Sequence, residues 1–302
     1  MFKGSITAMV TPFSADGKKV DDEALERFVE FQIKNNTDAL LPCGTTGEAM
    51  TLNHYEWSTV ICKVMRVAAG RVPVIAGASS NNTAVMVELV KEAKNMGADG
   101  ALVVTPYYNK PMQEGLYLHF KAAAEVGLPI IMYNVPGRTG VTITPETIVR
   151  LSKIPNIVAI KDATGSVDNM KAVLHDAPDF TILSGDDALT LPMRELGAKG
   201  VISVASNILP RQVAELASAP IEQARTMHLQ LLDIFKALFY ETNPIPVKES
   251  LGMMGMINPT LRLPLTPMGA ATKEKLKSAL KELGLIQEQG HENIGLSLQN
   301  SR

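Results

Sequence analysis

Residues 157–165 of this 302-residue chain read IVAIKDATG, four consecutive apolar residues followed by charged and hydroxyl side chains. An apolar run without polar alternation is typical of a strand that is buried on both faces, as in a parallel sheet. Longer amphipathic segments separate this run from others like it, and this alternation predicts parallel strands joined by helical crossovers. The eight runs are residues 5–10, 39–42, 72–76, 101–104, 129–133, 157–160, 181–183 and 201–204.

The spacing of these runs favours a closed barrel over an open sheet. Eight strand–helix units occupy about the first 218 residues, which is close to the size of a (β/α)8 barrel. An open doubly wound sheet usually carries G-x-G-x-x-G after its first strand, whereas here that strand leads into Thr11, Pro12 and Phe13. No G-x-x-x-x-G-K phosphate loop occurs in the sequence. We therefore predict the α/β class and a TIM barrel.

After residue 220 the strand–helix rhythm stops. Residues 221–239, 247–254 and 272–283 have helical patterns separated by proline-rich breaks, and residues 287–302 are polar and mixed. We predict that residues 1–219 form the barrel and carry the active site. Residues 220–302 are expected to form a C-terminal helical region that ends in a loosely docked polar tail.

Composition and charge exclude several classes of protein. The chain has 29 basic and 31 acidic side chains, a formal net charge of -2 and 46% apolar residues. It lacks the clustered Lys and Arg that bind phosphates, and no apolar stretch approaches the roughly 18 residues that span a bilayer. Residues 5–10 are too short for a secretory signal, and Cys43 and Cys62 are too few for a disulfide framework. We expect a cytoplasmic protein that binds a small molecule, and neither nucleic acid nor membrane.

The sequence does not indicate a metal or a cofactor. The five histidines are scattered and form no H-E-x-x-H pair or similar spacing. Asp186 and Asp187 could together ligate magnesium, but a lone acidic pair after a strand more often caps the next helix. We expect no metal and no cofactor.

Polar side chains gather after the predicted strands. In a TIM barrel the loops at the carboxyl ends of the strands meet at one mouth, where catalytic groups lie. Hydroxyl, amide and charged groups follow six of the eight runs, so we expect the site at this mouth. The segments are residues 44–48 (GTTGE), 105–109 (TPYYN), 133–140 (YNVPGRTG), 161–165 (KDATG), 184–187 (SGDD) and 203–206 (SVAS).

Lys161 is the candidate nucleophile because a fully apolar strand delivers it into the mouth. Desolvation disfavours the ammonium, and lowering a lysine pKa by about three units corresponds to roughly 4 kcal/mol. The resulting neutral amine can form an imine with a ketone. Position alone equally allows a lysine that extends to solvent from the strand end. Lys110, in a loop, and Lys248, in the helical region, do not follow an apolar strand and are weaker candidates.

Three further features of the mouth have both a functional and a plain structural interpretation. Tyr133 closes the strand next to that of Lys161 and could relay protons, or it could be a rim aromatic with a satisfied hydroxyl. The loop at residues 44–47 offers backbone N–H groups and two hydroxyls to a carboxylate, which alone is a weak indication. Arg138 could bind a carboxylate bidentately or form a surface ion pair.

Together these motifs resemble those of the dihydrodipicolinate synthase family of pyruvate-dependent class I aldolases. GTTGE, TPYYN, YNVPGRTG and an apolar strand ending in KDATG occur in the order and spacing of that family. The resemblance extends over nearly the whole chain, from residues 4–13 to residues 264–267. The conjunction of motifs favours Lys161 over the two other lysines.

The resemblance implies roles for individual residues. Lys161 would form the Schiff base, and Tyr133 would donate and accept protons, completed as a relay by Thr45 and by Tyr108 from a neighbouring subunit. The remaining implied roles concern substrate binding. Thr46 and the backbone at Ile202 would hold pyruvate, Arg138 would bind the carboxylate of the aldehyde substrate, and Gly185 would line the pocket.

The implied reaction condenses pyruvate with L-aspartate 4-semialdehyde in diaminopimelate and lysine biosynthesis. The imine supplies the electron sink, so no cofactor is required. Related enzymes, N-acetylneuraminate lyase and 2-keto-3-deoxy sugar-acid aldolases, share the lysine and the barrel, but in the sialic-acid branch the arginine after Tyr-Asn is absent. A pyruvate-binding barrel without catalysis is the other alternative, which the complete set of reactive groups disfavours.

The resemblance also bears on assembly and regulation. It implies a homotetramer built from tight dimers. Many relatives bind L-lysine between subunits, and here Ala49, Trp57 and Val85 stand where a serine, a second histidine and a glutamate often occur. Without a carboxylate at position 85 to receive the ammonium of the effector, we expect weak or absent feedback by L-lysine.

Overall fold

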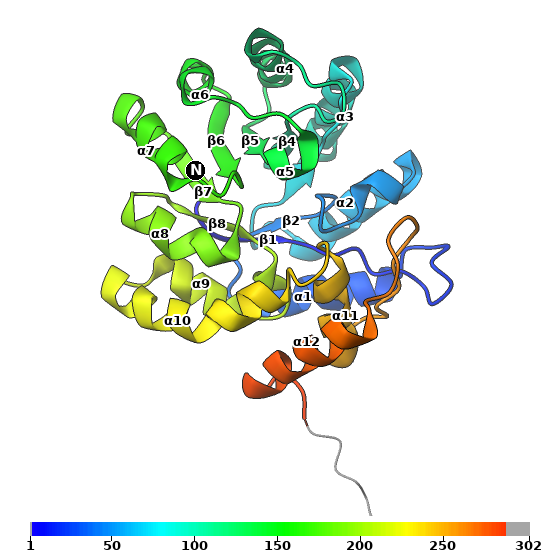
Figure 1. Ribbon diagram of the computed structural model, residues 1–302. Coiled ribbons are helices and arrows are strands. Elements are labelled where there is room, and N and C mark those ends of the chain that lie inside the picture. Colours follow the sequence, from blue (N-terminus) through cyan, green and yellow to red (C-terminus); the bar gives the residue numbers. More distant parts are fainter. Residues whose placement is uncertain (1, 288–302) are drawn as a thin grey trace, which may run out of the picture.

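The computed structural model describes residues 2–287, and its eight strands form one parallel sheet (Figure 1). The order in the sheet is β2-β1-β8-β7-β6-β5-β4-β3, and a parallel bridge between Leu40 and Val74 joins the two end strands. The predicted TIM barrel is therefore confirmed. The strands are β1 Gly4–Ala8, β2 Ala39–Leu41, β3 Ile75–Gly77, β4 Gly100–Val104, β5 Ile130–Asn134, β6 Ile157–Asp162, β7 Thr181–Ser184 and β8 Gly200–Ser203.

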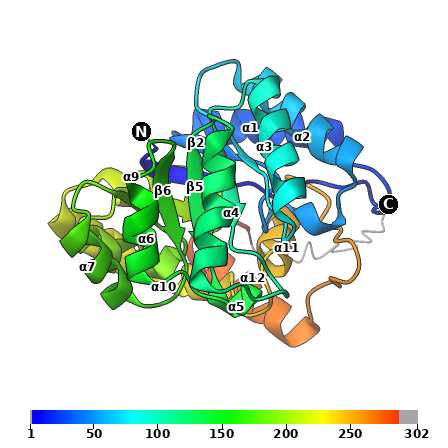
Figure 2. The ribbon, with the colours of Figure 1, turned by 90° about the horizontal axis from the view of Figure 1, so that it is seen from above.

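Helices connect successive strands and surround the barrel (Figures 1 and 2). At the first turn of α2, Asn53 and Glu56 form a reciprocal capping box. The α-helices of this part are α1 Asp22–Lys34, α2 His54–Ala68, α3 Thr83–Met96, α4 Gln113–Glu125, α5 Pro136–Thr139, α6 Pro145–Ser152, α7 Val167–Asp176, α8 Thr190–Glu195 and α9 Pro210–Ser218. The 3-10 helices are η1 Ala49–Thr51, η2 Asp187–Leu189 and η3 Ala205–Asn207.

Two apolar cores hold the barrel together. The larger core lies between the outside of the sheet and the surrounding helices. The smaller core fills the inside of the barrel, where residues such as Ile6, Ile131 and Ile202 are fully buried. Because side chains alternate along a strand, each strand sends one set of residues to each core. The inner core excludes water below the mouth.

The C-terminal region adds three helices, α10 Ile221–Ala237, α11 Ile245–Met253 and α12 Ala270–Glu282. Helix α10 packs against α8, α9 and α12, and α11 packs against α12 and η3. The boundary between a barrel and a helical unit at residue 220 remains an interpretation, because these helices pack directly on the barrel. The predicted polar tail lies, from residue 288 onward, outside the described residues. No described helix is long and apolar enough to cross a membrane.

Candidate active site

Lys161 and Tyr133 lie side by side inside the barrel. The register of β5 and β6 pairs Tyr133 with Lys161, and the Lys161 Nζ is 4.2 Å from the centroid of the Tyr133 ring. Both residues are 6% exposed. Strand β6 extends through Asp162, two residues beyond the predicted run, because Lys161 and Asp162 still pair with both neighbouring strands. Lys161 is thus part of the strand and does not extend to solvent.

Burial controls the protonation of Lys161. Loss of hydration lowers the pKa of Lys161 to about 7, while the negative charge of Asp187 raises it and the positive charge of Arg138 lowers it further. Asp187 is itself buried, and its Oδ2 accepts hydrogen bonds from the backbone N–H groups of Val204 and Ala205 at 3.0 and 2.9 Å. Near neutral pH a large fraction of Lys161 is therefore a neutral amine with a free lone pair.

Tyr133 remains protonated at neutral pH. Burial raises the pKa of Tyr133, while the charge of Arg138 and a hydrogen bond with Thr45 lower it. Its phenol faces a cavity of about 380 Å³, which Thr45, Tyr107, Arg138 and Asn243 also line. The Tyr133 ring thus lies beside a desolvated amine, and its phenol and the Thr45 side chain line the same cavity.

The GTTGE segment forms a tight turn at the edge of this cavity. The Glu48 N–H donates to the Thr45 carbonyl at 3.0 Å, and the Thr11 hydroxyl donates to the Gly47 carbonyl at 2.7 Å. A Cβ at Gly47 would lie 3.0 Å from the Met9 carbonyl oxygen, so the turn needs glycine there. The turn is therefore closed on itself and tied to the segment that follows β1.

Asn243 joins this turn to Arg138, and the sequence analysis did not identify it. The Asn243 side-chain amide donates to the Thr46 hydroxyl at 3.0 Å, and the Asn243 carbonyl accepts from the Arg138 guanidinium at 3.0 Å. Arg138 lies on α5, next to the cavity. The Asn243–Pro244 peptide bond is cis. Two prolines within three residues after Asn243 indicate a constrained turn, but nothing in the sequence directs that turn to the mouth.

The three other predicted residues lie in different surroundings. Ile202 is fully buried on β8, and Gly185 follows β7, where a Cβ would approach Ala163 to 2.8 Å. Tyr108 is 90% exposed and does not line the cavity, whereas Tyr107 does. Thr45, Tyr133 and Arg138 thus line one cavity, Lys161 contacts the Tyr133 ring, and Thr46 contacts Asn243. Ile202 lies on β8 and Gly185 directly after β7, and Tyr108 is not brought to the cavity. Among residues 2–287, no group of three or more potential metal ligands occurs.

The chain is similar to proteins of one family. The model of the Dihydrodipicolinate synthetase family matches residues 1–283. The 4-hydroxy-tetrahydrodipicolinate synthase of Geobacter metallireducens is 56% identical over 292 residues, which cover 95% of this chain and all of that protein.

Solved structures give the same result. The chloride-inhibited dihydrodipicolinate synthase of Acinetobacter baumannii, complexed with pyruvate, has a TM-score of 0.93 and 48% identity, covering 95% of this chain and 100% of that one. A structure described as the first monomeric dihydrodipicolinate synthase variant has a TM-score of 0.91 and 45% identity, covering 94% of this chain and 98% of that one.

Proposed function

Since this chain belongs to the dihydrodipicolinate synthetase family, we propose that it condenses pyruvate with L-aspartate 4-semialdehyde through an imine on Lys161. It is an enzyme of the class I aldolase type, and its activity is that of a 4-hydroxy-tetrahydrodipicolinate synthase, which serves diaminopimelate and lysine biosynthesis. The single observation that carries the role of Lys161 is its buried amine, which lies against the Tyr133 ring and forms no ion pair among the described residues.

The proposed steps follow from a neutral amine at this position. The Lys161 amine adds to the keto carbon of pyruvate, and loss of water leaves an imine. The imine acidifies the pyruvate methyl group, which loses a proton and becomes an enamine. The enamine carbon attacks the aldehyde carbon of the second substrate. The amino group of that substrate then attacks the imine carbon, closes the ring and releases Lys161.

Each of these steps moves a proton, and Tyr133 is the group in reach. The Lys161 amine lies over the Tyr133 ring and Thr45 lines the same cavity as Tyr133, so we assign the proton transfers to the hydroxyls of Tyr133 and Thr45. Positioned acid–base groups typically contribute about 100- to 10,000-fold. In our proposal Tyr108 of a second copy completes the relay, because Tyr108 within one chain is 90% exposed and does not line the cavity. The assembly we propose is a homotetramer of tight dimers.

The substrate carboxylates are assigned to two parts of the mouth. Thr46 and the backbone at Ile202 are proposed to hold pyruvate, and Gly185 to line the pocket. Arg138 is proposed to bind the carboxylate of the aldehyde, since its guanidinium borders the cavity and Asn243 restrains it. We further propose that the enzyme works in the cytoplasm.

Borohydride reduction in the presence of pyruvate tests the covalent step. Reduction traps the imine as a stable amine adduct, and peptide mass mapping then locates it. We expect the adduct on Lys161 and none without pyruvate. An adduct on Lys110 or Lys248 would refute the assignment. Turnover of aspartate semialdehyde, with N-acetylneuraminate as the comparison substrate, tests the second half of the reaction.

A further inference from the structure

A buried ionic cluster lies directly behind the GTTGE turn, and the proposed reaction does not use it. It consists of Glu48, the last residue of the motif, together with Lys248, Arg262, Glu56 and Phe13. The Lys248 and Glu48 side chains are 0% and 1% exposed. Lys248 comes from α11 and Arg262 from the segment after it, so both cations belong to the C-terminal region.

Glu48 is the residue at which the two parts of the chain meet. Its Oε1 accepts a hydrogen bond from the Lys248 ammonium at 2.5 Å, and its Oε2 accepts one from the backbone N–H of Arg262 at 3.1 Å. The Lys248 ammonium also donates to the Thr260 carbonyl at 2.8 Å and lies 4.1 Å from the Phe13 ring centroid. Both carboxylate oxygens of Glu48 are therefore engaged by the C-terminal region.

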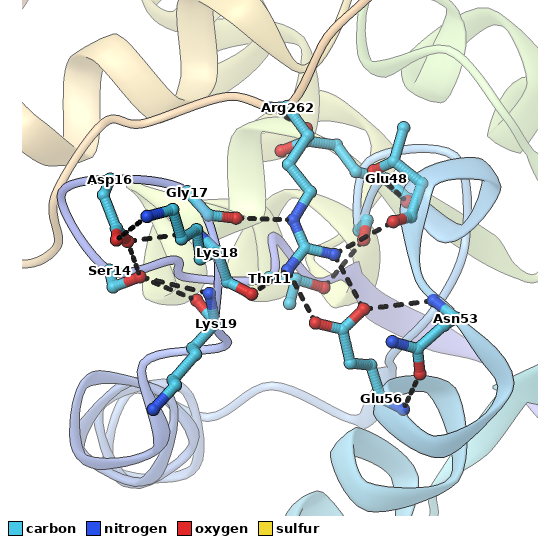
Figure 3. Close-up of polar contacts among 12 residues, drawn as sticks. Thr11, Ser14, Asp16, Gly17, Lys18, Lys19, Glu48, Asn53, Glu56 and Arg262 are labelled. Atoms are coloured by element: carbon cyan, nitrogen blue, oxygen red, sulfur yellow. Dashed lines mark hydrogen bonds and ion pairs between the residues drawn. The ribbon is translucent and has the colours of Figure 1, made fainter.

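Arg262 connects Glu48 to Glu56 and to the loop around Gly17, as Figure 3 shows. Its guanidinium forms a two-point ion pair with Glu56 on α2, at 2.7 and 2.6 Å, and donates to the carbonyls of Gly17 and Thr51. It also lies 4.3 Å from the Phe13 ring centroid, so this buried ring contacts both cations. Glu56, unlike Glu48, has no contact with the GTTGE turn among the hydrogen bonds of the described residues.

Stability alone does not account for a fully buried pair at this place. Desolvation of both ions offsets most of their attraction, so a buried ion pair contributes little net stability compared with apolar packing. Its directional contacts, however, fix the position of the residue that makes them. Glu48 also has a left-handed backbone, with φ 53°, and its N–H closes the turn on the Thr45 carbonyl. A shift of Glu48 would therefore move Thr45 relative to Tyr133.

We propose that Glu48 is a positioning residue, which Lys248 and Arg262 hold so that the Thr45 hydroxyl stays in line with Tyr133 for proton transfer. This inference rests on the proposed function, because it assigns Glu48 a role in the same relay. It makes the C-terminal helices part of the active site. The GTTGE turn follows strand β2, and it is held in place only when α11 and the segment carrying Arg262 pack against it.

The test compares Glu48→Gln with Glu56→Gln and counts active sites chemically. The fraction of Lys161 trapped by borohydride at saturating pyruvate gives the number of competent sites, and kcat is divided by that number. A misplacement of about 1 Å can lower a rate about 100-fold. For Glu48→Gln we expect kcat per trapped site to fall about 10- to 100-fold while trapping stays near the wild-type extent. For the matched control Glu56→Gln we expect a change within about twofold.

A purely structural role would lower trapping and total activity in parallel and leave kcat per trapped site unchanged, and that result would overturn the proposal. The double variant Glu48→Gln with Lys248→Met should be no slower per site than the slower single variant, because both act through one contact. Should Glu48→Gln not fold, Lys248→Arg keeps the charge but alters the contact, and the same loss per site is expected. Failure of the wild-type enzyme to form any Lys161 adduct would instead refute the proposed function itself.

Discussion

Two buried lysines near the barrel mouth differ in their polar partners. The Nζ atoms of Lys161 and Lys248 lie 4.2 and 4.1 Å from the centroids of the Tyr133 and Phe13 rings. Burial lowers the pKa of both lysines, to about 7 and about 8. Lys248, however, donates to the Glu48 carboxylate at 2.5 Å, whereas no ion pair of Lys161 occurs among the described residues.

The difference teaches that burial alone does not make a nucleophile. A desolvated ammonium with a carboxylate partner keeps its proton and fixes geometry, since its surroundings bind the charged form. A desolvated amine without such a partner loses its proton near neutral pH and has a lone pair to offer. We thus interpret one buried lysine as a nucleophile and the other as a residue that fixes geometry. Four experiments test this contrast.

The same substitution at both lysines should have very different effects on catalysis. Lys161→Met removes the proposed nucleophile, and we expect kcat to fall about 10,000-fold or more. Lys248→Met leaves Lys161 in place, so imine trapping should persist and kcat should fall no more than about 100-fold. Steady-state kinetics together with borohydride trapping measure both. Comparable losses of trapping in the two variants would contradict the different roles that we assign to Lys161 and Lys248.

Stability should respond in the opposite order. Lys248→Met leaves Glu48 buried without its partner, and breaking a buried pair in this way typically costs about 3–5 kcal/mol of the free energy of unfolding. Lys161→Met removes an ammonium that forms no ion pair among the described residues and that only the charge of Asp187 offsets, so we expect a smaller loss. Urea unfolding of both variants at pH 7 measures the difference. A destabilised Lys161→Met beside an unaffected Lys248→Met would reverse our interpretation of the two sites.

The rate of imine formation should depend on the pKa of Lys161. Because that pKa is about 7, the neutral fraction falls about tenfold per pH unit below pH 7 and levels off above it. The rate of pyruvate adduct formation should therefore rise with pH and reach a plateau above about pH 7. Rapid trapping across pH 5–9 measures this profile. If the rate of adduct formation keeps rising above pH 7, Lys161 has the pKa of a hydrated lysine and our interpretation is wrong.

The two lysines also differ in how well the sequence predicts them. Lys161 follows a continuous apolar run, so its burial is a local property, and the predicted runs match the strands to within a few residues. Lys248 meets Glu48 across 200 residues of sequence. A contact at that separation depends on how the C-terminal helices dock, which periodicity does not contain. The position of Asn243 was missed for the same reason.

Sequence reasoning is also limited for residues that are proposed to act in the active site of a neighbouring subunit. Tyr108 is exposed in one chain, so neither its sequence nor its position within that chain assigns it to a relay. The resemblance to a family carried that role, and it remains a prediction. The barrel can be predicted without the family resemblance, because parallel strands buried on both faces are continuous apolar runs in the sequence.

The smallest effect we predict concerns a free lysine, the amino acid itself. The contrast between Lys161 and Lys248 implies that a site holds an ammonium only where it offers a carboxylate. The resemblance described above implies that relatives which bind L-lysine often carry a glutamate at the position of Val85 and a histidine at that of Trp57. Here Val85 is exposed, and Trp57 is buried with its indole N–H donating to the Gly77 carbonyl at 2.8 Å. The aromatic ring is thus part of the core and not of a polar pocket.

We expect 1 mM L-lysine to change the initial rate by less than about twofold, because nothing at position 85 compensates the desolvation of its ammonium. A dose–response curve at subsaturating pyruvate measures this. Val85→Glu restores only the missing carboxylate, and Val85→Gln is its uncharged control of the same size. If Val85→Glu gains inhibition and Val85→Gln does not, the carboxylate decides where an ammonium is held. Strong inhibition of the unaltered enzyme by L-lysine would show that the ammonium of the effector can be bound without a carboxylate at position 85.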